Sequence, residues 1–104
     1  MGKERWYYKK SADEIISTLK EISKEISGGV EVDDISRKIK IVTPPSLLSY
    51  GEIIEVLIDN YKDGVAVTVE ANPRVWFNIT SNPDRYLRHI TDKLNSIHKG
   101  QKIG

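Results

Sequence analysis

Two stretches with helical periodicity, one near each end of the chain, constrain the fold most. Their apolar residues recur at intervals of three and four, as Ile15, Leu19, Ile22 and Ile26 and again as Leu87, Ile90, Leu94 and Ile97. This spacing places each set on one stripe of an amphipathic α-helix. A helix with a single apolar stripe has to bury it against another element, so both helices need a shared apolar surface.

The first helix has clear start and stop signals. Ser11 and Glu14 are three residues apart, which is the spacing of a capping box. Gly28-Gly29 follows the last apolar position, and glycine commonly ends helices because it adopts positive φ angles. The sequence therefore predicts a helix over about Ala12–Ser27.

The second helix has start and stop signals of the same kind. Asn82 can cap it, Pro83 suits the first helical position and Asp84 complements the helix dipole. Gly100 is expected to end it. We predict that the tail, Gln101–Gly104, is frayed.

The segments before and between the helices have strand character. They combine β-branched or aromatic residues with partial alternation, and they are separated by polar turns, by Pro44-Pro45 and by Asp63-Gly64. The predicted strands are Arg5–Lys9, a hairpin of Val30–Ile35 with Ile39–Thr43, and a second hairpin of Glu52–Asp59 with Val65–Ala71. Arg74–Ile79 fits either a short strand or an ordered loop.

Together these elements predict an α+β fold. Two helices pack on one face of a mostly antiparallel sheet, as a two-layer sandwich with the order β-α-β-β-β-(β)-α. The 104 residues fit a single domain over 1–104, with an ordered core at about 4–99. The expected sheet is covered on one side only.

Composition excludes several classes of site. The chain has no Cys, which rules out disulfides, thiolate nucleophiles and cysteine-based metal centres. No apolar segment resembles a signal peptide or a membrane span, so we predict a cytoplasmic protein. The Ile-, Lys- and Glu-rich composition suits a thermophile and equally an AT-rich genome.

Metal and cofactor sites are not predicted. Asp59, Asp63, Gly64 and Glu70 match four positions of a calcium-binding EF-hand loop, but the flanking residues alternate like strands. His89 and His98 are nine residues apart, which puts them on opposite sides of one helix. No catalytic motif such as a nucleophile elbow or a P-loop is present, and we therefore lean against an enzyme.

Basic residues gather at the two chain ends although the net charge is only +1. Residues 1–10 hold four basic side chains and one acidic side chain, residues 72–104 hold six and two, and the middle is acidic. Cations mixed with aromatic rings are typical of proteins that bind single-stranded nucleic acid. The candidate partner-binding residues are Arg5, Trp6, Tyr8, Lys9, Arg74, Trp76, Arg85, Arg88 and His89.

One segment carries a resemblance. The stretch Thr43–Glu52, TPPSLLSYGE, precedes a strand hairpin and a capped last helix. It resembles a turn found in small uncharacterised prokaryotic α+β domains that run strand, helix, antiparallel strands, helix. This resemblance implies the same fold and no particular activity.

Two functional hypotheses follow from the sequence. The first is a non-catalytic binding or interaction module for a protein or a small ligand, and self-association of its charged faces is compatible with it. The second is a nucleic-acid-binding domain that uses the basic and aromatic residues of the chain ends. The sequence pI of 7.9 is low for a dedicated nucleic-acid module, so the first hypothesis leads.

Overall fold

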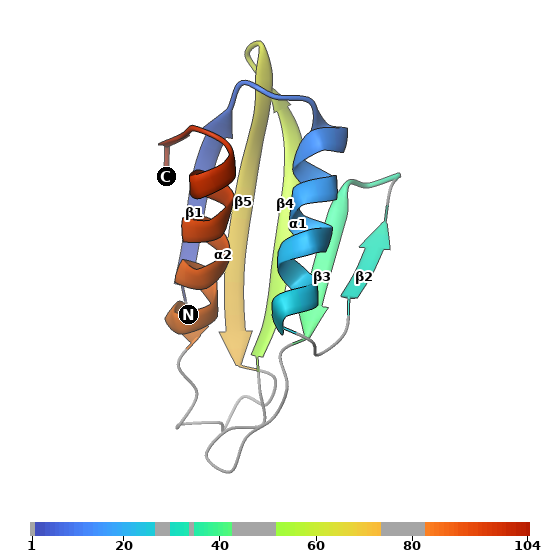
Figure 1. Cartoon of the computed structure of the whole chain (residues 1–104), viewed down its shortest axis with the longest axis vertical. Coiled ribbons are helices and arrows are strands. Elements are labelled where there is room, and N and C mark those ends of the chain that lie inside the picture. The colour runs from blue at the N-terminus through green and yellow to red at the C-terminus, as the bar shows by residue number, and fades with distance from the viewer. Residues whose placement is uncertain (1, 27–29, 34, 43–51, 74–82) are drawn as a thin grey trace.

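A computed structural model describes residues 2–26, 30–33, 35–42, 52–73 and 83–104 of the chain. Two helices lie side by side on the same face of one sheet (Figure 1). The elements are β1 (Gly2–Tyr8), α1 (Ala12–Ile26), β2 (Val30–Asp33), β3 (Lys38–Val42), β4 (Glu52–Tyr61), β5 (Gly64–Pro73), α2 (Pro83–Ile97) and β6 (Gly100–Lys102).

All pairs of neighbouring strands are antiparallel, in the order β2-β3-β4-β5-β1-β6. This confirms the α+β sandwich. The predicted element order was incomplete, because a further strand follows α2; the four described strands between the helices correspond to the two predicted hairpins. The segment Arg74–Ile79, for which strand and loop were both open, lies outside the described residues.

Alternation along the strands separates two faces. The helix-facing side is buried at its centre, where Ile39, Ile54, Val56, Val67 and Val69 are all 0% exposed. The helices contribute their predicted apolar stripes to the same core. We call the other side the open face, because no described helix covers it. Its charged and partly exposed residues are Lys3, Arg5, Tyr7, Glu31, Asp33, Lys38, Lys40, Val42, Ile53, Glu55, Leu57, Asp59, Tyr61, Thr68 and Glu70.

Neither described helix is both long and apolar enough to cross a membrane.

The start of α1 agrees with the cap that the sequence predicts, with one difference. The backbone N–H of Glu14 donates to the Ser11 hydroxyl oxygen at 3.2 Å, and the N–H of Ile15 donates to the Ser11 carbonyl at 3.2 Å. The Glu14 carboxylate accepts from the Ser11 hydroxyl at 3.4 Å, whereas in a full capping box it would accept from the Ser11 backbone N–H. Ser11 therefore satisfies one of the helix-start donors through its side chain.

Replacing Ser11 by alanine should lower the free energy of unfolding by about 1 kcal/mol, because the Glu14 N–H loses its acceptor. Urea unfolding followed by circular dichroism measures this loss. Ser17→Ala, at an exposed position inside the same helix, is the control and should be neutral or slightly stabilising. Equal effects of the two substitutions would contradict a specific capping role.

The prediction that the tail Gln101–Gly104 is frayed is wrong. Gly100–Lys102 forms β6 against β1, and the contact continues beyond it. The N–H of Ile103 donates to the Arg5 carbonyl at 2.8 Å, and the Arg5 N–H donates to the Gly104 carbonyl at 2.9 Å. The tail is ordered because β1 offers it an unpaired strand edge, a long-range contact without a local sequence signal.

The β4–β5 hairpin is longer and tighter than predicted. Tyr61 pairs with Gly64, so only Lys62 and Asp63 form the loop. The positive φ of this turn is at Lys62, at 50°, and not at the glycine. Gly64 is required for a different reason, since a Cβ there would lie 2.1 Å from the carbonyl oxygen of Tyr8. The alternating strand pattern therefore extends up to the turn.

Candidate functional site

The aromatic residues of β1 divide between the two faces of the sheet. Tyr8 is 0% exposed in the core, and its hydroxyl donates to Oδ1 of Asn95 on α2 at 2.7 Å. Burial raises the pKa of Tyr8 well above the usual range. The structure thus places this predicted binding residue in the core, where its ring has no accessible surface. Trp6 also points to the helix side and is partly buried, with its Nε1–H donating to Glu4 at 3.0 Å.

Arg5 lies on the open face, within a small cluster of cations and rings. Its guanidinium carbon is 5.5 Å from the centre of the Tyr61 ring, and Lys62 Nζ is 5.4 Å from the same centre. The Tyr7 and Tyr61 rings are 5.6 Å apart and tilted by 60°. We call Arg5, Tyr7, Tyr61 and Lys62 the cation–tyrosine cluster. Two cations near one ring are the arrangement of cation–π contacts.

Lys9 and Tyr7 meet at Asp63 in the β4–β5 turn. The Tyr7 hydroxyl donates to the Asp63 carboxylate, and Lys9 Nζ lies 3.4 Å from the same group. The bond from Tyr7 is the main cause that holds the pKa of Asp63 below its usual value, and it raises the pKa of Tyr7. This turn therefore links the predicted residue Lys9 to the cation–tyrosine cluster.

The lowered pKa of Asp63 determines how the stability of the fold changes with pH. A carboxyl whose folded pKa is depressed adds stability above its unfolded value of about 3.9. That stability is lost as pH falls through the folded pKa. Asp63→Asn should therefore lower the urea midpoint at pH 7 and reduce the further loss between about pH 5 and pH 2. Asp59→Asn, which removes the same charge from β4, is the control, and an unchanged pH profile in Asp63→Asn would contradict the role of the Tyr7 bond.

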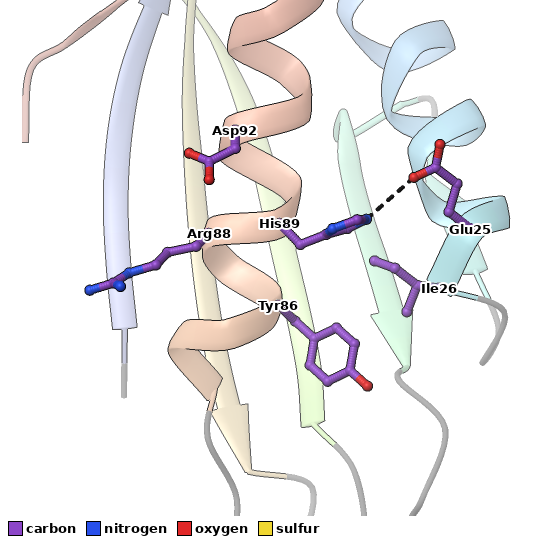
Figure 2. A pocket seen from close by; sticks show the side chains of 6 residues that line it. All are labelled: Glu25, Ile26, Tyr86, Arg88, His89 and Asp92. Carbon is purple, nitrogen blue, oxygen red and sulfur yellow. Dashed lines mark ion pairs between the residues drawn. The ribbon is translucent and has the colours of Figure 1, made fainter.

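The basic residues of α2 do not join the cation–tyrosine cluster. Arg88 and His89 point to different sides of the helix, with His89 directed toward α1 and Arg88 directed away from it (Figure 2). Arg5, by contrast, faces the opposite side of the sheet. Arg88 and His89 therefore do not lie on one common side of α2. Arg74 and Trp76 lie outside the described residues, as does the side chain of Arg85.

His89 lines a cavity of about 500 Å³ beside the two helices. Its Nε2 lies 3.3 Å from an oxygen of Glu25 on α1, and Lys93 Nζ is 3.8 Å from the other oxygen of that carboxylate. Tyr86 and Ile26 also border the cavity (Figure 2). The side chains of His89, Glu25 and Lys93 are 40–49% exposed, so solvent weakens these pairs. This arrangement is suited to holding α1 and α2 together.

The second histidine also reaches α1. His98 Nε2 lies 2.8 Å from the Thr18 hydroxyl, which itself donates to the Glu14 carbonyl at 3.0 Å. Because the single hydroxyl proton is used in that bond, His98 Nε2 acts as the donor. The two histidines thus contact α1 at Thr18 and Glu25, about two helical turns apart. Each bridges the helices separately.

The open face contains a feature that the sequence reasoning missed. Leu57 is 39% exposed at its centre, beside a hollow of about 180 Å³. The other side chains around this hollow are Lys3, Lys38, Glu55, Thr68 and Glu70, and Lys38 Nζ lies 2.9 Å from Glu55. The sequence of β4 does contain a signal for an exposed Leu57. In the strand alternation Leu57 is in phase with the charged Glu55 and Asp59. The buried residues Ile54, Val56 and Ile58 are in the opposite phase.

Within the described ranges, no three His, Asp or Glu side chains are close enough to hold a metal ion. The described candidate surfaces are thus the open face, with its cation–tyrosine cluster, and the cavity beside the helices. A scan of protein-family models and a search of curated proteins find no match to this chain.

Proposed function

We propose that this protein is a non-catalytic interaction module that binds a protein partner through the open face of its sheet. The observation that carries the proposal is the exposed Leu57 within a ring of charged side chains. An apolar centre with a polar rim is the usual anatomy of a protein–protein interface. The expected partner presents an apolar side chain flanked by charges that complement this rim.

The choice of the open face is supported by the fact that the two helices already pack against the other face of the sheet. Its apolar residues are already covered by α1 and α2, so a partner there would have to displace a helix. On the open face, the exposed parts of Leu57, Lys38 and Glu55 can be covered without any change of fold. Because the sheet is rigid, little conformational entropy is lost in ordering the binding residues when a partner binds.

Site-specific photo-cross-linking in cells that make the protein tests this proposal. A photoreactive residue replacing Leu57 should yield an adduct of defined mass, and the same residue replacing Ser17, exposed on α1, should not. Charge reversal of the rim, as Lys38→Glu with Lys3→Glu, should abolish the adduct at position 57. An absence of adducts at 57, or adducts that survive charge reversal, would refute the open face as a specific binding surface.

The cation–tyrosine cluster favours a second candidate, the binding of single-stranded nucleic acid. Tyr7 and Tyr61 are partly exposed on an uncovered strand surface, and Arg5 and Lys62 supply positive charge beside the Tyr61 ring. Stacking on aromatic rings within a basic groove is the general mode of such binding. Asp63 and Asp59, which lie close by in the chain, weaken this candidate through their negative charge.

A heteronuclear NMR titration with short mixed-sequence single-stranded DNA and RNA tests the second candidate. We expect shifts at Arg5, Tyr7, Tyr61 and Lys62 that disappear as salt rises, and none at Arg88 on the helical layer. Tyr61→Leu should weaken the shifts while keeping the fold. An unchanged spectrum at high nucleic-acid concentration would eliminate this candidate.

A further inference from the structure

We infer that the partner on the open face is a second copy of this chain, related by a two-fold axis that runs parallel to the strands above β4. The inference rests on the proposed function, because it names the occupant of the same surface. The order of charges across the sheet and the register of the strands together support this arrangement.

The charges of the open face form bands that follow the strands. β2 is acidic through Glu31 and Asp33, and its neighbour β3 is basic through Lys38 and Lys40. On the other side of β4, β5 carries Glu70, and next to it β1 is basic through Lys3 and Arg5. Moving outward from β4, the sign order is therefore positive then negative on one side, and negative then positive on the other.

This order makes the face complementary to itself about β4. A two-fold axis parallel to β4 exchanges left and right across the sheet, so β2 of one copy faces β1 of the other, and β3 faces β5. The acidic bands of β2 and β5 then meet the basic bands of β1 and β3, while β4 faces itself. The opposed pairs are Glu31 with Lys3, Asp33 with Arg5, and Lys40 with Glu70, each formed twice.

The register brings these pairs to the same height along the strands. Glu31 is opposite Lys40 and Lys40 is opposite Glu55. Glu55 is opposite Glu70, which is opposite Lys3, so all five lie in one row. The row of Asp33, Lys38, Leu57, Thr68 and Arg5 is continuous in the same way. Rotation about an axis along β4 keeps each row level, so no sliding is needed.

The alternative symmetric arrangement is unfavourable. A two-fold axis in the plane of the sheet but perpendicular to the strands would place each strand over itself, with the acidic β2 over β2 and the basic β3 over β3. Like charges in direct opposition disfavour such a pairing. With the axis along β4, Leu57 meets Leu57 at the centre. The Glu55 side chains also face each other along this axis, each already paired with Lys38 at 2.9 Å, and the Asp59 side chains face each other nearer the β4–β5 turn.

The size of the face sets the expected affinity. Neighbouring strands lie about 4.8 Å apart, and each residue advances about 3.3 Å along a strand. The five strands β2, β3, β4, β5 and β1 therefore present a face of roughly 600 Å². This is somewhat below the roughly 800 Å² per partner of a standard interface. We therefore expect a reversible dimer with a dissociation constant of about 10–100 μM, since small interfaces are generally weak.

Sedimentation equilibrium of the full chain, from about 20 μM to about 1 mM, tests the inference, because this range spans weak association constants. The wild-type chain should pass from monomer to dimer. Leu57→Asp should raise the dissociation constant about 100-fold, since it puts two carboxylates at the centre of the contact. Ser17→Asp, on the exposed side of α1, is the matched control and should leave the constant unchanged.

A charge-swap experiment tests the two-fold axis itself. Glu31→Lys and Lys3→Glu each create two like-charge contacts in a dimer and should each raise the dissociation constant about 10-fold. In an equimolar mixture of the two variants, the contacts between positions 3 and 31 of the heterodimer are again opposite-charge pairs. Its dissociation constant should return to within about twofold of the wild-type value. Both positions are exposed, and thermal unfolding checks that each variant stays folded.

The outcomes separate this inference from the proposed function. A chain that is monomeric at about 1 mM, or variants whose mixture does not regain affinity, would overturn self-association through this face. If position 57 still yields an adduct with a different protein, the open face remains a binding surface with another partner. If position 57 yields no adduct at all, both proposals fail.

Discussion

Tyr8→Ala is expected to lower the free energy of unfolding by about 4 kcal/mol, the largest effect among the substitutions considered. The Tyr8 ring is fully buried between the sheet and α2, and its hydroxyl binds Asn95. Truncation leaves a cavity that the rigid β1–β5 ladder cannot close. It also leaves the Asn95 Oδ1 atom without its donor. Urea unfolding followed by circular dichroism and by tryptophan fluorescence measures the loss.

A second variant separates the contributions of the Tyr8 hydroxyl and of the Tyr8 ring to the free energy of unfolding. Tyr8→Phe keeps the ring and removes only the bond to Asn95, so it should cost about 1–2 kcal/mol. If Tyr8→Ala cost no more than Tyr8→Phe, packing of the ring would not contribute to the stability of the core. Neither variant should alter the contacts of the open face, because Tyr8 points away from it.

Gly64→Ala is expected to cost about 3 kcal/mol, because the added methyl group would collide with backbone that cannot move aside. The Cβ would lie 2.1 Å from the Tyr8 carbonyl oxygen and 2.8 Å from the Lys9 Cα. Relief requires β1 to separate from the β4–β5 turn, which would also break the Tyr7 and Lys9 contacts with Asp63. The variant should therefore lose stability and shift the NMR signals of residues 7–9.

The control for Gly64 is a glycine with more room. At Gly104, the nearest heavy atom to an added Cβ is the Arg5 Cβ at 3.3 Å, and a small shift of the chain end relieves that contact. Gly104→Ala should cost well under 1 kcal/mol by comparison. Equal losses for the two variants would mean that the approach of β1 to the turn is not the reason for the glycine at 64.

The two proposals for the open face make different demands on the same side chains. Self-association depends on the bands around Leu57, whereas nucleic-acid binding depends on the cation–tyrosine cluster near the β4–β5 turn. Arg5 belongs to both regions, so its substitution alone would not distinguish them. Tyr61→Leu and Leu57→Asp each affect one region and therefore separate the two.

Local spacing in the sequence was sufficient for the helices and for both hairpins. The stripe from Ile15 to Ile26, the Ser11 cap and the first-position Pro83 each act within one or two helical turns. The alternation of Val65, Val67 and Val69 likewise identified a half-buried strand, and Leu57 in phase with Glu55 was a readable signal of the open face. These features were predictable because the physical cause and the sequence pattern involve neighbouring residues.

The arrangement of β1 was decided by tertiary structure. Alternation alone places Trp6 and Tyr8 on one side of the strand and Arg5 and Tyr7 on the other, but both sides contain an aromatic residue. Only the pairing of β1 with β5 determines which side enters the core. That pairing joins the first strand to residues near the middle of the chain, and no local pattern encodes it.

The sequence by itself determined the type, the approximate position and the amphipathic character of each described helix and of the four hairpin strands, because these depend on short-range periodicity and capping. Tertiary structure decided the strand order β2-β3-β4-β5-β1-β6 and the existence of β6. It also separated Arg5 from Arg88 and aligned acidic and basic bands across the open face. These properties depend on hydrogen bonds between strands far apart in the chain, where contact energy and not local conformational preference selects the partner.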